Sequence, residues 1–163
     1  MLNYFINLTF KKVTVGKLSS GGRNNLGRVC VFGRGGGNKK LYRYIDFYRR
    51  VNAFGVVYKI LYDPNRTAKI CFILYHNGAA ACSLKVEGLK RKSGIYSGSN
   101  DVSHITKIMT GFSLPLRYIG SFNVVSNVES KPFNGGSISR AAGSSCFFFG
   151  KDALKGVLKM RSG

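Results

Sequence analysis

A basic, glycine-rich stretch between Gly22 and Arg50 is the feature that most constrains how this chain can fold. It holds eight Lys or Arg residues, six Gly and five aromatic residues against a single acid, Asp46. Such a mixture cannot build a hydrophobic core. Glycine lets the backbone approach a bulky partner closely, guanidinium groups pair with phosphate oxygens, and aromatic rings offer faces to bases. The stretch therefore predicts a nucleic-acid-binding surface.

Two enzymatic interpretations of these glycines disagree with the residues that follow them. Residues 22–27 have the GxxxxG spacing of a phosphate-binding loop, but Arg28 and Val29 stand where that chemistry needs Lys and then Ser or Thr. The glycines of 33–37 precede a strand-like alternation at 41–45, whereas a dinucleotide site needs a helix there. A solvated, flexible loop rich in Gly and Lys remains the alternative.

The charge of the whole chain points to a polyanionic partner. There are 26 basic and 6 acidic residues, which gives a formal charge of +20 over 163 residues. Thirteen basic residues lie in 1–66 and thirteen in 67–163. This even spread favours a protein surrounded by nucleic acid over a globule with one basic tail. RNA or DNA is the expected partner, and an anionic membrane surface is a distant third.

Several longer motifs follow one another along the chain. They are GRNNLGR (22–28), GRGGGNKKLYR (33–43), IDF (45–47), YDPNR (62–66), GLK (88–90), LPLRYI (114–119) and GGSISRAAGS (135–144). Their order and spacing resemble those of the ribosomal protein L2 family of the large subunit. The resemblance implies a structural constituent of the large ribosomal subunit that binds and folds rRNA in translation, near the peptidyl-transferase and subunit-interface region. It also implies other ribosomal proteins as partners.

Short runs rich in β-branched and aromatic residues predict an all-β fold. These runs are 29–32, 41–45, 56–62, 68–75, 79–84 and 95–97, and then 120–128, 145–149 and 157–160. Between the two series, 101–112 is the candidate for irregular or briefly helical backbone. Five or so strands with such turns indicate an oligonucleotide-binding-type (OB) barrel, which the resemblance also implies, together with an SH3-like barrel for the second series. We expect an extended N-terminal arm at 1–28, an OB-type barrel at 29–99, and an incomplete SH3-like barrel at 100–163.

The residues expected to contact rRNA combine positive charge, side-chain amides and one aromatic ring. They are Arg23, Asn24, Asn25, Arg28, Arg34, Lys39, Lys40, Tyr42, Arg43 and Arg66, with Lys90, Arg117 and Arg140 in the later motifs. At least half of their contacts should go to phosphate and sugar, and RNA should be recognised by shape more than by base edges.

No catalytic residue, metal ligand or cofactor is expected. Neither His76 nor His104 has a carboxylate near it in a recognisable pairing, so each is interpreted as structural or RNA-facing. The four cysteines show no C-x-x-C spacing, which argues against a zinc site or a disulfide framework. They are expected to be small buried apolar groups: Cys30, Cys71, Cys82 and Cys146.

The carboxylates are scattered, and two of them lie close to arginines in the sequence. Asp46 and Asp63 are each within four residues of an Arg. We interpret both as orienting groups that form ion pairs with Arg43, Arg49 and Arg66, and not as general bases.

The first ten residues and the composition bear on location. The apolar run 1–10 is too short for a membrane span, and no cleavage pattern follows it. It is interpreted as a docking arm, with a disordered terminus as the alternative. The Phe-rich composition without Trp and the lack of a recognisable presequence favour a mitochondrial ribosome. A plastid or a bacterial cytoplasm is the alternative.

Members of the resembled family usually continue beyond the last strand run seen here. We therefore expect a separate chain carrying the C-terminal half of the family to pair with the open sheet edge beyond residue 160.

An RNA-binding module that works outside the ribosome is the alternative function. Such a module should keep one concave basic face, whereas an embedded protein is basic on many sides.

Overall fold

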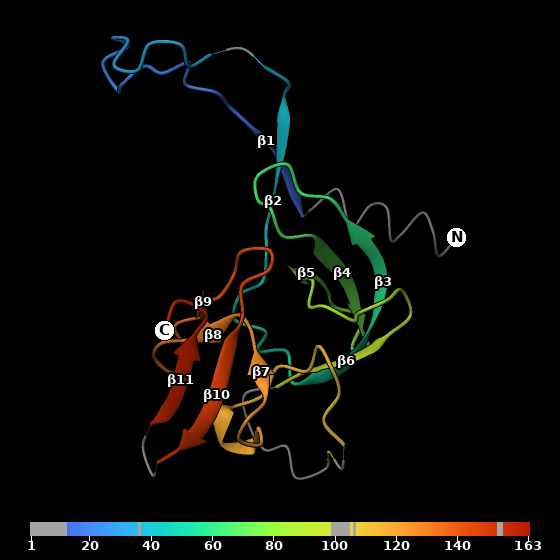
Figure 1. Cartoon of the computed structure of the whole chain (residues 1–163). Coiled ribbons are helices and arrows are strands. Elements are labelled where there is room, and N and C mark those ends of the chain that lie inside the picture. Colours follow the sequence, from blue (N-terminus) through green and yellow to red (C-terminus); the bar gives the residue numbers. More distant parts are fainter. Residues whose placement is uncertain (1–12, 36, 99–104, 106, 153–154) are drawn as a thin grey trace. The chain divides into compact units, whose positions relative to one another are not determined.

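The computed structural model describes residues 13–35, 37–98, 105, 107–152 and 155–163. The chain divides into two compact units, Met1–Tyr44 and Ile45–Gly163. Figure 1 labels the strands of both units, which are described separately below. The expected apolar arm at 1–10 and His104 lie outside the described residues.

The first unit is a two-stranded ribbon with a long loop between its strands. β1 (Thr14–Lys17) pairs antiparallel with β2 (Lys40–Arg43), from Thr14 opposite Arg43 to Lys17 opposite Lys40. Lys17 and Lys40, the residues on either side of the loop 18–39, are paired with each other, so both ends of the loop lie at the same end of the ribbon. In Figure 1 this loop is the blue-to-cyan segment that runs out from β1 and β2.

A four-stranded antiparallel sheet, ordered β5-β4-β3-β6, holds the main core of the second unit. Its strands are β3 (Ala53–Leu61), β4 (Ile70–Tyr75), β5 (Ala80–Leu84) and β6 (Gly94–Ser97). β4 is buried along nearly its whole length because it lies inside the sheet and carries the apolar run ICFILY. The core cluster consists of Val57, Cys71, Ile73, Tyr75, Leu89 and Ile95.

A buried arginine joins the edge of this sheet to a later segment. Arg49 is 8% exposed, and its guanidinium donates hydrogen bonds to Ser97 Oγ (2.9 Å), Tyr96 O (3.0 Å) and Gly111 O (2.9 Å). Tyr75 shares a further hydrogen bond of 2.8 Å with Ser97 Oγ. The cation is thus used to satisfy buried acceptors inside the fold.

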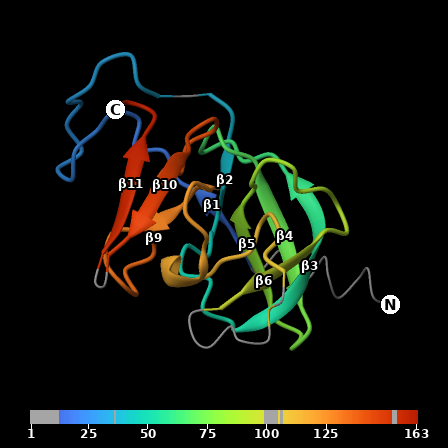
Figure 2. The ribbon, with the colours of Figure 1, turned by 60° about the horizontal axis from the view of Figure 1, so that its bottom comes forward.

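The later strands of the second unit form two smaller sheets. β7 (Val124–Val125), β10 (Cys146–Lys151) and β11 (Gly156–Met160) pair in the order β11-β10-β7. β8 (Val128–Glu129) pairs with β9 (Gly136–Ile138), and one short 3-10 turn, η1, covers Leu116–Tyr118. Figure 2 shows β10 and β11 apart from the four-stranded sheet of the same unit. Phe148 of β10 is fully buried and points inward.

The prediction of an all-β chain with an OB-type domain is confirmed, although no sheet formed by the described residues closes into a barrel. The runs at 41–45, 56–62, 68–75, 79–84, 95–97, 145–149 and 157–160 became strands with slightly shifted ends. The run 120–128 is broken into β7 and β8. The strand expected at 29–32 is wrong: Val29 forms an isolated bridge to Arg23, and turns and bends follow.

Candidate nucleic-acid interface

The loop of the first unit is closed on itself by its own backbone and one asparagine. Gly22 O accepts hydrogen bonds from Cys30 N (2.9 Å) and Val31 N (3.1 Å). Gly22 has φ +72°, and a Cβ there would lie 2.3 Å from Val31 O, so only glycine fits this position. Asn24 Oδ1 accepts from Leu26 N and Arg28 N, both at 3.0 Å. The conformation of this turn is therefore set by local bonds.

The closed loop directs the charged side chains of the first unit outward. All of the residues predicted in it are exposed: Arg23, Asn24, Asn25, Arg28, Arg34, Lys39 and Lys40. Over its whole length the unit Met1–Tyr44 has nine Lys or Arg residues and no Asp or Glu. Within the part of this unit that is described, no carboxylate side chain is present to neutralise these cations. A dense positive field over exposed backbone is what a phosphate chain binds.

The ribbon places the other two predicted residues of this unit at the base of the loop. Tyr42 and Arg43 are both half-buried on β2. The rings of Tyr42 and Tyr44 meet edge to face, with centroids 5.5 Å apart. Arg43 Nη1 donates to Leu41 O at 3.4 Å. The ribbon thus offers an aromatic pair next to the cationic loop.

In the second unit, Arg66 is held by a buried carboxylate. Asp63 is 1% exposed, and its Oδ2 accepts from Arg66 Nε at 2.6 Å. Its Oδ1 accepts from Asn65 N at 2.9 Å and Asn65 Nδ2 at 3.2 Å. Burial alone would raise the pKa of Asp63, but the hydrogen bonds from Asn65 and Arg66 outweigh it and hold this pKa below its usual value. The predicted Asp63–Arg66 ion pair is confirmed.

The remaining predicted residues are exposed cations, two of which lie over aromatic rings. Arg117 is 4.8 Å from the ring centre of Tyr118, and Arg140 is 5.1 Å from that of Phe47. Lys90 is exposed at the start of a turn, where its backbone N–H donates to Ser93 Oγ at 3.1 Å. A guanidinium over a ring keeps N–H groups free for phosphate oxygens.

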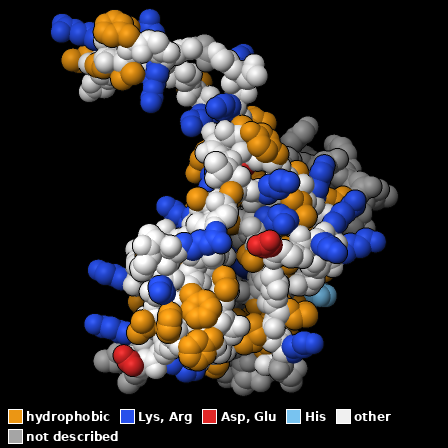
Figure 3. Space-filling view, in the orientation of Figure 1, with side chains coloured by type: hydrophobic (Ala, Val, Ile, Leu, Met, Phe, Trp, Pro, Cys, Tyr) orange, Lys and Arg blue, Asp and Glu red, His pale blue; other side chains and the backbone are white. Residues whose placement is uncertain are grey.

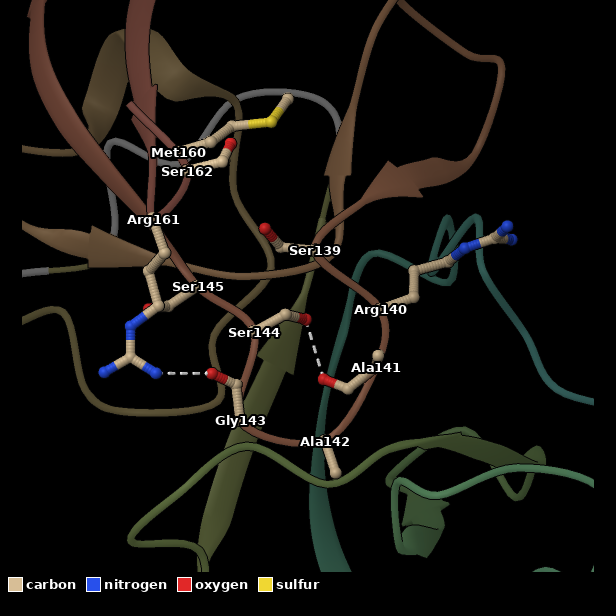
Figure 4. A pocket seen from close by; sticks show the side chains of 10 residues that line it. All are labelled: Ser139, Arg140, Ala141, Ala142, Gly143, Ser144, Ser145, Met160, Arg161 and Ser162. Atoms are coloured by element: carbon tan, nitrogen blue, oxygen red, sulfur yellow. Dashed lines mark hydrogen bonds between the residues drawn. The ribbon is translucent and has the colours of Figure 1, made fainter.

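A shallow hollow lies beside the last motif, between 139–145 and 160–162 (Figure 4). Its rim is fixed by hydrogen bonds from Arg161 Nη1 to Gly143 O (2.8 Å) and from Ser144 Oγ to Ala141 O (2.7 Å). Figure 4 shows the Arg140 side chain pointing away from the hollow.

The described residues contain no group of three or more His, Cys, Asp and Glu side chains that could hold a metal ion. Nor does that part of the chain hold a helix long and apolar enough to span a membrane.

Two expectations about individual side chains are wrong. Asp46 Oδ1 accepts backbone hydrogen bonds from Tyr48 N (3.0 Å) and Arg49 N (2.9 Å), while the Arg49 guanidinium donates to the buried acceptors described above. The expected ion pair between Asp46 and Arg49 is therefore replaced by a turn, and the Arg43 pairing stays a prediction. Cys71, Cys82 and Cys146 are buried as expected, but Cys30 is exposed, because the loop around it has no core.

Sequence reasoning missed two groups of exposed rings. The Arg50 guanidinium lies 4.6 Å from the ring centre of Tyr48 and 5.3 Å from that of Phe133, and it donates to Phe133 O. Phe122, Phe147 and Phe149 cluster on the three-stranded sheet, with all three side chains exposed. The sequence signal for this second group was the run of three Phe residues at 147–149. This run was interpreted only as part of a strand, without asking which of its rings would be exposed.

The chain is similar in sequence to a known protein family. The family described as "Ribosomal Proteins L2, RNA binding N-terminal domain" matches residues 10–97. "Large ribosomal subunit protein uL2" of Allorhizobium ampelinum is 40% identical over 154 residues, which are 94% of this chain and 54% of that protein. The proteins of the same name from Rickettsia canadensis and Alcanivorax borkumensis are each 43% identical, over 94% and 90% of this chain and 55% and 52% of theirs. The chain thus spans about half the length of these relatives, and it belongs to the ribosomal protein L2 family.

Proposed function

We propose that this chain is a structural constituent of the large ribosomal subunit that binds and folds rRNA. The observation that carries the proposal is the loop 18–39, closed by Gly22 and Asn24, in a unit with nine cations and no acid. Figure 3 shows Lys and Arg side chains over several parts of the visible surface, which suits a protein surrounded by RNA more than one with a single basic groove. The thirteen residues predicted above are the proposed rRNA contacts.

The proposal is tested by titrating the chain with a fragment of large-subunit rRNA at several salt concentrations. Changing Arg28 to Gln removes one phosphate contact, so it should weaken binding and flatten the slope of log K against log salt by about one unit. Arg28→Lys is the matched control, because it keeps the charge and should keep the slope. A Gln variant with an unchanged slope would show that Arg28 does not lie on RNA.

Placement within the cell is the finer part of the proposal. The Phe-rich composition without Trp supports a mitochondrial ribosome, whereas the relatives named above are bacterial and fit the bacterial cytoplasm. Ribosomes are sedimented from the source cells, with organellar and cytoplasmic fractions kept apart, and the chain is followed by mass spectrometry. The fraction that contains the chain decides between the two locations. Recovery of the chain away from large subunits would favour the free RNA-binding module. The separate C-terminal chain gains no support from the comparisons. Mass spectra of the purified large subunits test it, because they would contain peptides of a second chain of the family.

A further inference from the structure

The outer face of the sheet β11-β10-β7 is aromatic where a solvated face would be polar. On the central strand β10, Phe147 is 37% and Phe149 is 44% exposed, whereas Phe148 between them is fully buried. Side chains two residues apart on a strand share a face, and these two rings are in contact, with centroids 5.3 Å apart. The residues pair with β11 through a bulge between Phe148 and Gly150, which leaves Phe149 as the extra residue of the bulged strand.

A third ring joins them from the segment before β7. Phe122 is 67% exposed, and its ring centre lies 6.3 Å from that of Phe147 and 6.1 Å from that of Phe149. Its backbone N–H donates to Phe148 O, which fixes it beside β10. Phe122 also has φ +65°, a conformation that is strained for a bulky side chain. The fold thus holds a large ring in an unfavourable backbone conformation at the surface, where it adds nothing to the buried core.

The aromatic triad, Phe122, Phe147 and Phe149, has a basic flank on β11, while the exposed Val124 of β7 is the register partner of Phe147 on the other side. Lys159 of β11 is the register partner of Phe147 and is exposed. Residues directly opposite in an antiparallel pair point to the same side of the sheet, so Lys159 flanks the rings. Over 146–161 the chain carries three Lys and one Arg against a single acid, Asp152. In Figure 3 the apolar cluster over β7 and β10 is visible at the surface, with Lys and Arg side chains around it.

We propose that the aromatic triad is a stacking site for two or three unpaired nucleotides of RNA, with Lys159 on the connecting phosphate. Rings at alternate positions of a central strand, with a further ring beside them, are how sheet surfaces bind unpaired bases. The cores of protein interfaces are instead depleted of charged residues, so an exposed cation directly beside the rings fits RNA better. That the ligand is RNA rests on the proposed function, which this inference extends. It adds base stacking on the second unit to phosphate binding by the loop of the first.

The test is a titration of the full chain with a fluorescently labelled, unstructured eight-nucleotide RNA, followed by anisotropy. Phe147→Ala and Phe149→Ala should each weaken binding by about 5- to 150-fold, the range for one lost base–ring stack. Neither change removes a charge, so the salt slope should stay the same. Lys159→Gln should lower that slope by about 0.7, one phosphate of a single strand. The matched control is Tyr62→Ala, since Tyr62 is a 74% exposed ring that follows the end of β3 and lies outside the three-stranded sheet, and the affinity of this variant should equal that of the unchanged chain.

A second variant separates loss of the site from loss of the fold. Phe122→Gly removes the ring and relieves the positive φ, so it should bind the short RNA more weakly without melting at a lower temperature. The inference is overturned if Phe→Ala variants with unchanged melting bind the RNA as tightly as the unchanged chain does. It is also overturned if a density map of the assembled particle shows a protein segment over the rings. Failure of the proposed function looks different, because Arg28→Gln would then keep its salt slope whatever the triad variants do.

Discussion

Replacing Arg49 by Met should destabilise the second unit by about 2–4 kcal/mol. The side chain is 8% exposed and satisfies Ser97 Oγ, Tyr96 O and Gly111 O, three buried acceptors within 3.0 Å. Gly111 O is left without a donor, which costs about 1–3 kcal/mol. Ser97 Oγ keeps its hydrogen bond with Tyr75, and Tyr96 O keeps the one from Ser113 N, so each of these two loses one of two bonds, at about 0.5–1.5 kcal/mol. Part of this loss in free energy of unfolding is offset in the Met variant. Burial disfavours the Arg49 cation and lowers its pKa, whereas Met carries no charge to desolvate.

The assay is thermal unfolding followed by far-ultraviolet circular dichroism, with urea unfolding to measure the free energy. For a chain of 163 residues, each kcal/mol should shift the melting temperature by roughly 2–4 °C, so we expect a fall of about 5–15 °C. Arg50→Met is the matched control. Its guanidinium is exposed and contacts rings and one carbonyl at the surface, so it should cost at most about 1 kcal/mol. Equal losses in both variants, or none at Arg49, would refute the network as a source of stability.

Two further changes test the loop and the buried carboxylate. Gly22→Ala should cost the loop more than about 1 kcal/mol, because it places a Cβ at φ +72° against Val31 O, and it should weaken rRNA binding in the salt titration. Gly27→Ala, at φ +80° but in open space, should have a smaller effect; the reverse order would contradict the proposed loop structure. Because the pKa of Asp63 is lowered in the fold, its stabilisation is present above the unfolded carboxyl pKa of about 4 and is lost as pH falls through the folded value. Asp63→Asn should therefore be less stable than the unchanged chain near pH 7, and this difference in stability should shrink as the pH falls below the unfolded carboxyl pKa. A difference independent of pH in urea unfolding would disprove the assignment.

Local patterns were enough to predict most of the strands and the cationic loop. β4 reads ICFILY, and a short apolar run with β-branched and aromatic residues, bounded by turn residues, favours a buried strand. The density of Arg and Gly between 22 and 43 predicts an exposed, charged loop, because such residues cannot pack against one another. β1 was missed because TVGK is four residues long and mostly exposed, and it becomes a strand only through its pairing with β2. The strand predicted at 29–32 did not form for the opposite reason. Its residues are apolar enough for a strand, but they are exposed and pair with no strand beyond one isolated bridge.

The sequence by itself determined the charge, the all-β character and the family, because these depend on composition and on motifs whose residues are neighbours in the chain. Only the tertiary structure decided which arginines are exposed. Arg49 and Arg50 are adjacent in the same basic run. The Arg49 side chain is buried and donates to Tyr96, Ser97 and Gly111, whereas the Arg50 side chain is exposed over the Tyr48 ring. The same holds for Phe147, Phe148 and Phe149, of which only the middle ring is buried. The physical reason is that burial is set by contacts between distant segments, and a local run of like residues carries no information on which side of a sheet each will face.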